Sequence, residues 1–352
     1  MSRALTTVRE TDSRHPMLKH LDAALADKRT PEDEGLDVSF MSRSFCLSGL
    51  PLRKQYERDK KTRKAVEPAK EVSVFSRKDE RFALSIASVP FDTSDAGVVQ
   101  FGLPYGARAR MLILWMTTAA RQKNRSSGDR WLEIGRIDDW LESCGITPHP
   151  NNASMAKDQL IRLAFTVFTM SLKDGDRNLS FFNRDVLINS AVFAADDLPH
   201  YLEGNLAKVR FPLGIELSQQ AYNKFTGDDV IPVSTEALRG ISSNAMAIDL
   251  YLYLAFRLPL ISHGESELVT WQKLANQFGS GEPRSRFRQV FDPSVDKALA
   301  AYRGANVTVT DEGLVLRYSD PAEAIKMFAV GPRRLELVDN SHRVRNRVGA
   351  KS

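Results

Sequence analysis

The chain has 352 residues, of which 42% are hydrophobic and 26% charged, and its formal net charge is +5. This length accommodates two folded domains with additional tails. Two cysteines, Cys46 and Cys144, are too few for a disulfide framework, and no apolar run is long enough to span a membrane. The N-terminus also lacks the apolar core of a signal peptide, so we expect a cytoplasmic protein.

Most of the positive charge lies in the two flanks of the chain. Residues 1–74 carry 15 Lys and Arg against 12 Asp and Glu, and residues 331–352 carry 6 against 2. We expect residues 1–73 to be a variable, partly disordered basic region and residues 331–352 a basic disordered tail. The basic run at 52–64 is either a solvated linker or an arm that binds DNA backbone phosphates.

Residues 74–228 are expected to form a first domain. Apolar periodicity predicts a long helix over Ala107–Ala120, and a second helix over Ile137–Cys144 that ends at Gly145. A third helix follows, for which Asn151–Ser154 supply cap residues. Alternating patterns on either side of Asp174 and Gly175 then predict a β-hairpin.

Residues 229–330 repeat this plan and are expected to form a second domain. The predicted helices are Asn244–Leu258, Trp271–Phe278 and Arg284–Tyr302, and a hairpin follows across Asp311-Glu312-Gly313. Three helices closed by a hairpin is the plan of a winged helix, a relative of the helix-turn-helix DNA reader. The sequence therefore predicts an α+β protein with two tandem winged-helix domains, of three helices plus a β-hairpin each, and flexible basic termini.

The third helix of the second domain has the side chains of a DNA-reading helix. Its apolar residues share one face, whereas Arg, Ser and Gln occupy the remainder, and these are the groups that pair with base edges in the major groove. The alternative is a solvated amphipathic helix. Pro293 predicts either one kinked helix or two abutting ones. The residues expected to read bases are Ser285, Arg286, Arg288 and Gln289.

Other basic side chains are expected to contact DNA phosphates. The second domain contributes a contact from the start of the third helix and one from the hairpin, while the first domain contributes cations from its first and third helices, where the basic excess is densest. The expected phosphate contacts are Arg284, Arg317, Lys157, Arg162, Arg108, Arg110, Arg121, Lys123 and Arg125.

The sequence offers little to support an enzyme. It contains neither a GxxxxGK[ST] phosphate loop nor a GxGxxG motif. The six histidines are scattered, without the His-x-His pair of a metal-dependent nicking initiator. The acidic pairs Asp138-Asp139, Asp196-Asp197 and Asp228-Asp229 fit capping and solvation better than a two-metal centre. We therefore expect no catalytic residue, no metal and no cofactor.

Several segments resemble the plasmid-encoded replication initiators of RepA type. The similarity is carried by Leu103–Trp115 and Ala247–Leu258, with further matches at Leu160–Leu163, Ile231–Val233, Trp271–Leu274, Phe278-Gly279 and Phe287-Arg288. It extends over roughly residues 98–318. The resemblance implies tandem winged helices that bind direct repeats (iterons) at a plasmid origin, the C-terminal one making the main base contacts and the N-terminal one handling phosphates and dimerisation.

The resemblance also implies the partners and the mode of action. Binding would bend and help to open double-stranded origin DNA and then recruit the host initiator and the replicative helicase, and a homodimer could repress its own promoter. From these expectations we predict a non-enzymatic replication initiator associated with plasmid DNA in the nucleoid. The alternatives are a winged-helix transcriptional regulator without a role in replication, or a DNA-nicking enzyme.

Overall fold

The computed structural model describes residues 14–24, 38–57, 66, 69–78, 82–93, 97–123, 128–174, 179–191, 197–279 and 284–325. The helices in chain order are α1 (Pro16–Ala24), α2 (Arg43–Leu47), α3 (Gly106–Gln122), α4 (Ile137–Ser143), α5 (Pro150–Ala164), α6 (Asp197–Leu202), α7 (Gln219–Thr226), α8 (Thr235–Ile241), α9 (Ala245–Arg257), the 3-10 helix η2 (Leu258–Leu260), α10 (Trp271–Phe278), α11 (Arg284–Ala301) and α12 (Pro321–Ile325). The strands are β1 (Val38–Ser42), β2 (Val74–Lys78), β3 (Phe82–Ser88), β4 (Phe91–Thr93), β5 (Gly97–Val99), β6 (Trp131–Glu133), β7 (Thr166–Asp174), β8 (Leu179–Val186), β9 (Ile188–Ala191), β10 (Gly214–Leu217), β11 (Val230–Ser234), β12 (Ser266–Thr270), β13 (Val307–Val309) and β14 (Gly313–Arg317).

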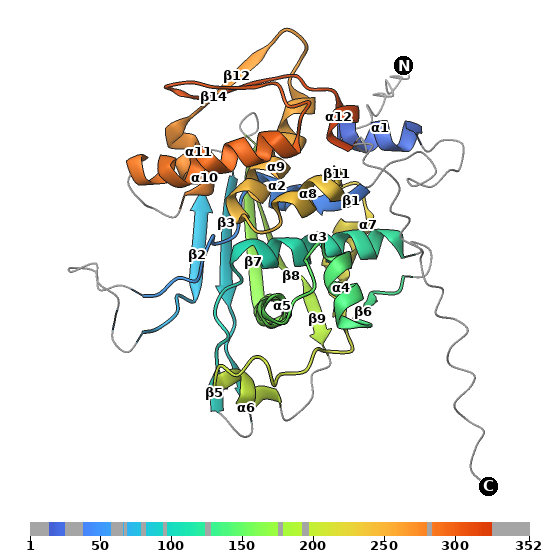
Figure 1. The fold of residues 1–352 in the computed structure, drawn as a ribbon, viewed down its shortest axis with the longest axis vertical. Coiled ribbons are helices and arrows are strands. Elements are labelled where there is room, and N and C mark those ends of the chain that lie inside the picture. Colours follow the sequence, from blue (N-terminus) through green and yellow to red (C-terminus); the bar gives the residue numbers. More distant parts are fainter. Residues whose placement is uncertain are drawn as a thin grey trace, which may run out of the picture.

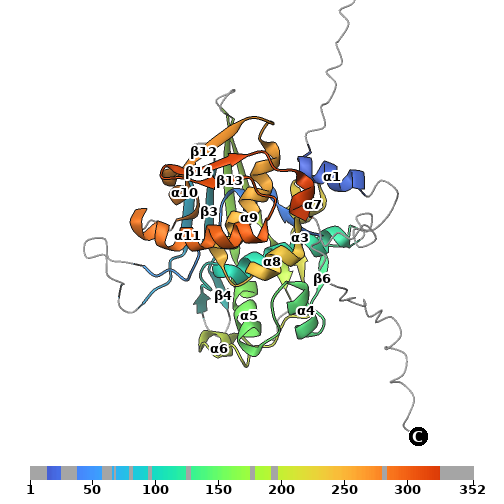
Figure 2. The ribbon, with the colours of Figure 1, turned by 45° about the horizontal axis from the view of Figure 1, so that its top comes forward.

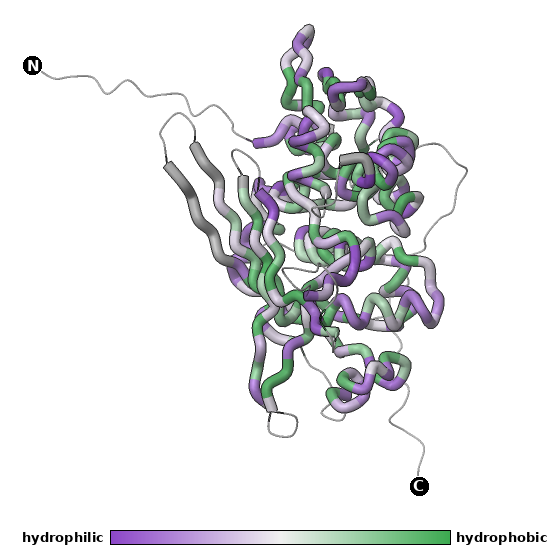
Figure 3. The backbone as a smooth tube through the Cα atoms, turned by 90° about the vertical axis from the view of Figure 1, so that its left-hand side faces the viewer, coloured by the Kyte–Doolittle hydropathy of each residue, from purple (hydrophilic) through white to green (hydrophobic). Residues whose placement is uncertain are grey.

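The described elements form a helical layer against one face of a four-stranded antiparallel sheet (Figures 1 and 3). The strand order in this sheet is β2-β3-β7-β8, and the remaining strands form smaller two- and three-stranded sheets. The predicted α+β class is confirmed. Within the described ranges, no helix combines the length and the apolar character needed to cross a bilayer.

The two long apolar helices lie at the centre of one continuous core. On α3 the side chains from Ala109 to Met116 are all buried, and Trp115 packs edge-to-face on Trp140 of α4. On α9 every residue from Met246 to Ala255 is buried, as its all-round apolar sequence predicted. Full burial of each large apolar side chain contributes about 1.5–3 kcal/mol to folding. The first-helix predictions for both repeats are confirmed.

The second unit has the element order and strand order expected of a winged helix. Helices α9, α10 and α11 are followed by the hairpin β13–β14, and β12, which lies between α9 and α10, pairs antiparallel with β14. Thr270 caps α10 by accepting a hydrogen bond from the backbone N–H of Lys273. Pro293 does not divide the third helix, since α11 continues from Arg284 to Ala301 as one helix.

The first unit has the same helix order but a different sheet. Its hairpin β7–β8 pairs with β3 rather than with the strand that precedes α4. That strand, β6, pairs with β10 instead. The cap of α5 also differs from the prediction, because His149 accepts the capping hydrogen bond from the N–H of Asn151 and Pro150 occupies the first turn. The two repeats therefore share their helix order, but only in the second does the hairpin pair with the strand between the first two helices.

Part of the N-terminal region differs from the expectation of a partly disordered segment. Strand β1 is buried along its whole length and pairs antiparallel with β11, almost 200 positions further on. The backbone N–H of Phe40 also donates to Thr118 Oγ1 of α3, at 2.9 Å. The apolar run in β1 is short and is flanked by charged residues, so its periodicity gave little indication of burial. Its stability comes from partners that are remote in the sequence.

A buried histidine joins α1 to the core and should make stability depend on pH. His15 Nε2 is 2.7 Å from the carbonyl oxygen of Phe256, and its Nδ1 accepts from the N–H of Met17 at 3.2 Å. Because Nδ1 accepts a hydrogen bond, it carries no proton and the His15 ring is neutral. Burial lowers the pKa of His15 to about 4. The charge of Arg43 also lowers this pKa, whereas the hydrogen bond with Phe256 acts in the opposite direction. Because the folded pKa lies below the unfolded value, the contribution to stability is present above pH 6.5 and is lost as the pH falls toward 4.

We expect the free energy of unfolding of the wild-type protein, measured with urea, to be lower at pH 5 than at pH 7. In His15→Gln the part of this difference that comes from His15 should disappear, while the carboxylate contributions remain. An equal pH dependence in both proteins would contradict the role assigned to His15. His263, which is exposed, provides the matched control in His263→Gln.

Candidate nucleic-acid interface

Helices α10 and α11 form a helix pair held by aromatic side chains. Trp271 and Phe278 of α10 and Phe287 and Phe291 of α11 are all essentially buried. The ring centroids of Trp271 and Phe291 are 5.6 Å apart at 90°, and those of Phe287 and Phe291 are 4.8 Å apart. Edge-to-face packing of this kind adds directional preference to the hydrophobic contact. These contacts fix which side of α11 faces outward.

Two of the predicted base-reading residues lie on the solvent-facing side of α11. Arg286 and Gln289 are exposed, and Val290 beside them is 48% exposed. The guanidinium of Arg286 and the amide of Gln289 carry the donors and acceptors that match guanine and adenine edges in the major groove. The side chains of Arg284 and Ser285 lie outside the described residues, although the backbone is helical at both positions.

Arg288 is held against the protein rather than extended into solvent. Its guanidinium lies 4.3 Å from the ring centroid of Trp271, and its Nη2 is 3.2 Å from Asp292 Oδ2. The edge of Arg288 that would form a bidentate contact with guanine therefore faces a carboxylate one turn along the same helix. A base that bound this edge would have to displace Asp292.

The predicted phosphate contacts of the first unit are wrong for three buried cations. Arg110 and Arg162 are each 3% exposed, and Lys157 is 6% exposed, so none of them can reach a phosphate. Arg110 donates to both carboxylate oxygens of Asp249, at 2.6 Å each. A buried charge is tolerated when it is paired or fully hydrogen-bonded, and each of the three has such partners.

The other two buried cations also have internal partners. Arg162 pairs with Asp158 at 2.9 Å and with Glu71 at 2.6 Å. Burial alone would lower the pKa of Arg162, but the hydrogen bond with Glu71 and the charges of Asp158 and Glu71 raise it above its usual range. Lys157 donates to the carbonyl of Leu206 at 3.0 Å and to that of Val209, and burial lowers its pKa. These contacts stabilise the first unit.

Three further side chains that were predicted to contact phosphates bind other groups of the protein instead. Arg108 donates to the carbonyl of Ser242 and to Asn152 Oδ1, and burial lowers its pKa. Arg121 donates to the carbonyls of Thr226 and Gly227 and lies over the ring of Phe40. Lys123 pairs with Asp129 at 2.5 Å. Arg125 lies outside the described residues.

The hairpin adds little positive charge to the interface. Arg317 Nη1 donates to Thr308 Oγ1 at 3.0 Å, across the two strands of the hairpin. The exposed residues at the turn are Asp311 and Glu312, both acidic. The hairpin is therefore weakly equipped for phosphate contacts.

Two exposed cations near α11 were missed by the sequence reasoning. Lys297 is exposed on α11 itself, and Arg239 is exposed on α8, which packs against α11 (Figure 2). Helix α8 has only seven residues, and its periodicity is too short to indicate which of its side chains face outward. The Ser234 cap, which accepts from the N–H of Ala237, was the available signal for this helix.

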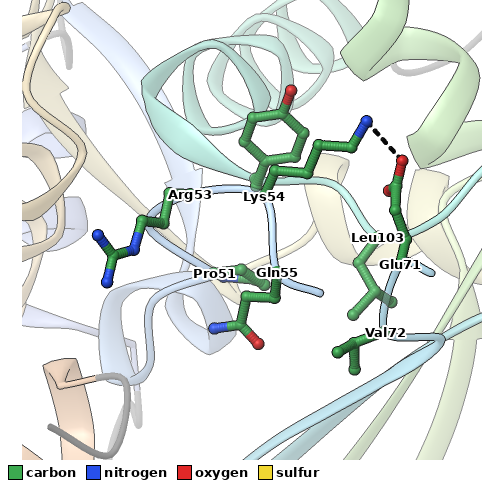
Figure 4. A pocket seen from close by; sticks show the side chains of 8 residues that line it. Pro51, Arg53, Lys54, Gln55, Glu71, Val72 and Leu103 are labelled. Atoms are coloured by element: carbon green, nitrogen blue, oxygen red, sulfur yellow. Dashed lines mark ion pairs between the residues drawn. The ribbon is translucent and has the colours of Figure 1, made fainter. Parts of the chain in front are cut away.

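The hollow beside residues 51–55 has a volume of about 10 Å³, room for one water molecule at most, and the ion pair of Lys54 and Glu71 at 2.5 Å lies at its wall (Figure 4). Among the described residues there is no group of three His, Cys, Asp or Glu side chains with the arrangement of a metal site.

The comparisons with known proteins agree with the resemblance that the sequence carries. Residues 103–273 match the family model described as plasmid-encoded RepA protein. Over this stretch the chain is similar to the RepA family. The matched region contains α3 to α9 and reaches the first turn of α10, so it includes both central helices. None of the curated proteins matches the sequence.

Two solved structures of domains 2 and 3 of RctB are similar to this chain over most of its length. One is 12% identical with a TM-score of 0.46, and the other is 11% identical with a TM-score of 0.47. Each comparison covers 79% of this chain and 98% of the other.

Proposed function

We propose that this chain is a RepA-type replication initiator that binds repeated sites in double-stranded DNA at a plasmid origin. The observation that carries the proposal is the solvent-facing side of α11, where Arg286 and Gln289 extend from the second helix of a helix pair. A helix pair of this type places its second helix in the major groove. The family match over residues 103–273 supports the plasmid origin as the target.

In this proposal, affinity comes from phosphate contacts and specificity from α11. Lys297 and Arg239 are exposed cations beside the reading helix and would approach the backbone on either side of the groove. Each phosphate that a protein neutralises makes binding weaker at higher salt. Arg286 and Gln289 would then select the sequence through base edges, each good contact contributing about 1–3 kcal/mol.

The later steps of initiation complete the proposal. Binding to several repeats bends and helps to open the origin, and the bound protein recruits the host initiator and the replicative helicase. A homodimer represses the promoter of its own gene. These steps are supported by the family match rather than by particular contacts.

Footprinting on the DNA that flanks the gene tests the proposal most directly. We expect regularly spaced protection at intervals of about 20 base pairs, two helical turns, so that successive copies bind the same side of the duplex. A single protected site at a promoter would favour a transcriptional regulator. A plasmid that carries the repeats but lacks this gene should fail to replicate, and its survival would also favour the regulator.

We further propose that the chain acts on DNA without cleaving it. Supercoiled origin DNA incubated with the protein and Mg²⁺ or Mn²⁺ should remain supercoiled. Accumulation of a nicked circular product would support the enzyme instead.

Substitutions at the Arg288–Asp292 pair should separate base reading from phosphate binding. Arg288→Ala should weaken binding to repeat DNA more than to random DNA. Asp292→Asn should strengthen binding to repeat DNA about twofold, since an exposed ion pair one turn apart removes only about 0.3–0.5 kcal/mol of competition. Fluorescence anisotropy with both DNAs measures these changes. An equal loss of affinity for the two DNAs in Arg288→Ala would indicate that Arg288 contacts a phosphate rather than a base.

A further inference from the structure

A buried segment that precedes both units crosses the place where they meet. We call this segment, residues 47–51, the strap. Ser48 and Leu50 are each 2% exposed, and Gly49 and Pro51 are also buried. The strap follows α2 and leads toward the sheet of the first unit. It contacts elements of both units through its backbone carbonyls.

The strap is attached to the first unit by two arginines. Leu50 O accepts from Arg110 Nη2 of α3 at 2.6 Å and from Arg77 Nη2 of β2 at 3.4 Å. Pro51 O accepts from the backbone N–H of Gly106 at 2.9 Å and from Arg110 Nη1 at 3.2 Å. Hydrogen bonds with a charged donor are stronger than neutral ones, so these carbonyls are held firmly.

The strap is attached to the second unit through α9 and α10. Leu47 O accepts from Gln277 Nε2 at 2.5 Å. Gly49 packs so closely on Asp249 of α9 that an added Cβ would lie 1.9 Å from Asp249 Oδ2, which leaves room for glycine alone. Asp249 is in turn bound by Arg110, so the strap, α3 and α9 share one network.

Arg77 also connects the two units directly. It is 4% exposed, lies over the ring of Phe75, and donates through Nη1 to the carbonyl of Gln277. Gln277 is in the last turn of α10, where a cation is favoured by the helix dipole. Figure 1 shows β2 ending beside α10. Gln277 is therefore held by its side chain to the strap and by its backbone to the sheet.

We propose that Arg77 and the strap set the orientation in which α10 and α11 are presented to DNA. The C-terminal end of α10 immediately precedes the connection to α11, and the aromatic contacts make the two helices move together. A shift at Gln277 is thus transmitted to Arg286 and Gln289. Arg77, which lies in the first unit and touches no base, is a positioning residue for DNA reading. This inference rests on the proposed function.

The test compares repeat DNA with random DNA in full-length variants. Arg77→Met should weaken binding to repeat DNA on the order of ten- to a hundredfold, the loss of one good base contact. Binding to random DNA should change by less than about twofold, because it depends on exposed charge rather than on the angle of α11. Arg77→Lys should restore most of the affinity, and Gly49→Ala should behave like Arg77→Met. Arg136→Met, which removes an arginine that is 81% exposed on α4, is the matched control and should bind like the wild type.

The orientation itself can be measured with spin labels on Asp138→Cys in α4 and Gln272→Cys in α10, both exposed positions. Both native thiols are buried, and burial raises the pKa of Cys46 and of Cys144, so the labels attach at the introduced sites. The label-to-label distance distribution should broaden in Arg77→Met and narrow again in Arg77→Lys.

Three outcomes would overturn the inference: an unchanged distance distribution, no selective loss on repeat DNA, or equal losses on both DNAs that follow the folded fraction from thermal melting. A wild-type protein without preference for the repeats would instead refute the proposed function. The distance distribution would still decide whether Arg77 sets the orientation of α10.

Discussion

Arg110→Met should lower the free energy of unfolding by about 3–5 kcal/mol, because it leaves the buried carboxylate of Asp249 without its counter-charge. Asp249 is 2% exposed and makes both of its short ion-pair contacts with Arg110. The substitution also removes the closer of the two arginine donors to Leu50 O in the strap. Urea unfolding at neutral pH followed by circular dichroism measures the change.

A double substitution and a surface control identify the cause of this loss. The double variant Arg110→Met with Asp249→Leu should lower the free energy of unfolding by less than either single substitution does, because no unpaired buried charge remains. Arg136→Met breaks an exposed pair with Asp139 and should change stability by less than about 1 kcal/mol. A loss below about 1 kcal/mol in Arg110→Met itself would contradict the buried network.

Arg286→Ala should weaken binding to repeat DNA by about 1–3 kcal/mol, roughly five- to a hundredfold, while the protein remains as stable as the wild type. Arg286 is exposed on α11, on the flank of the face formed by the aromatic residues that hold the helix. Its removal therefore takes away a base contact without opening a cavity. Anisotropy titrations against repeat and random duplexes measure the effect, and thermal melting verifies the fold.

Lys297→Ala is the matched control for Arg286→Ala. It removes an exposed cation from the same helix, three turns further on. We expect it to weaken binding to the two DNAs equally and to reduce the salt dependence by about one phosphate contact. If Arg286→Ala behaved in the same way, Arg286 would contact a phosphate and α11 would not read sequence through it.

The helices of both repeats followed from local features of the sequence. The apolar stripe of Phe287, Phe291 and Val295 predicted a single packed face on α11, and these residues are buried. Thr270 and Gly279 predicted both ends of α10. Such signals depend on residues a few positions apart, whose spacing on a helix is set by the backbone.

The strand pairing in the sheet of the first unit could not be predicted from local sequence, because the paired strands lie far apart in the chain. Strand β3 pairs with β7 more than 80 positions later, and the sequence of β3 does not indicate its partner. The strand that precedes α4 resembles its counterpart in the second unit in position but pairs with β10. Strands at equivalent positions of the two repeats therefore joined different sheets.

The sequence by itself determined the three helices of each repeat, the α+β class and the hairpin of the second unit. The base-reading role of α11 stays a prediction. Only the tertiary structure decided which cations are available to DNA. Arg110 and Arg286 are both arginines near the start of a helix, yet one is buried on Asp249, 139 positions away, and the other faces solvent. The physical reason is that helix periodicity is a local property, whereas the environment of a charge depends on partners that only the folded chain brings near it.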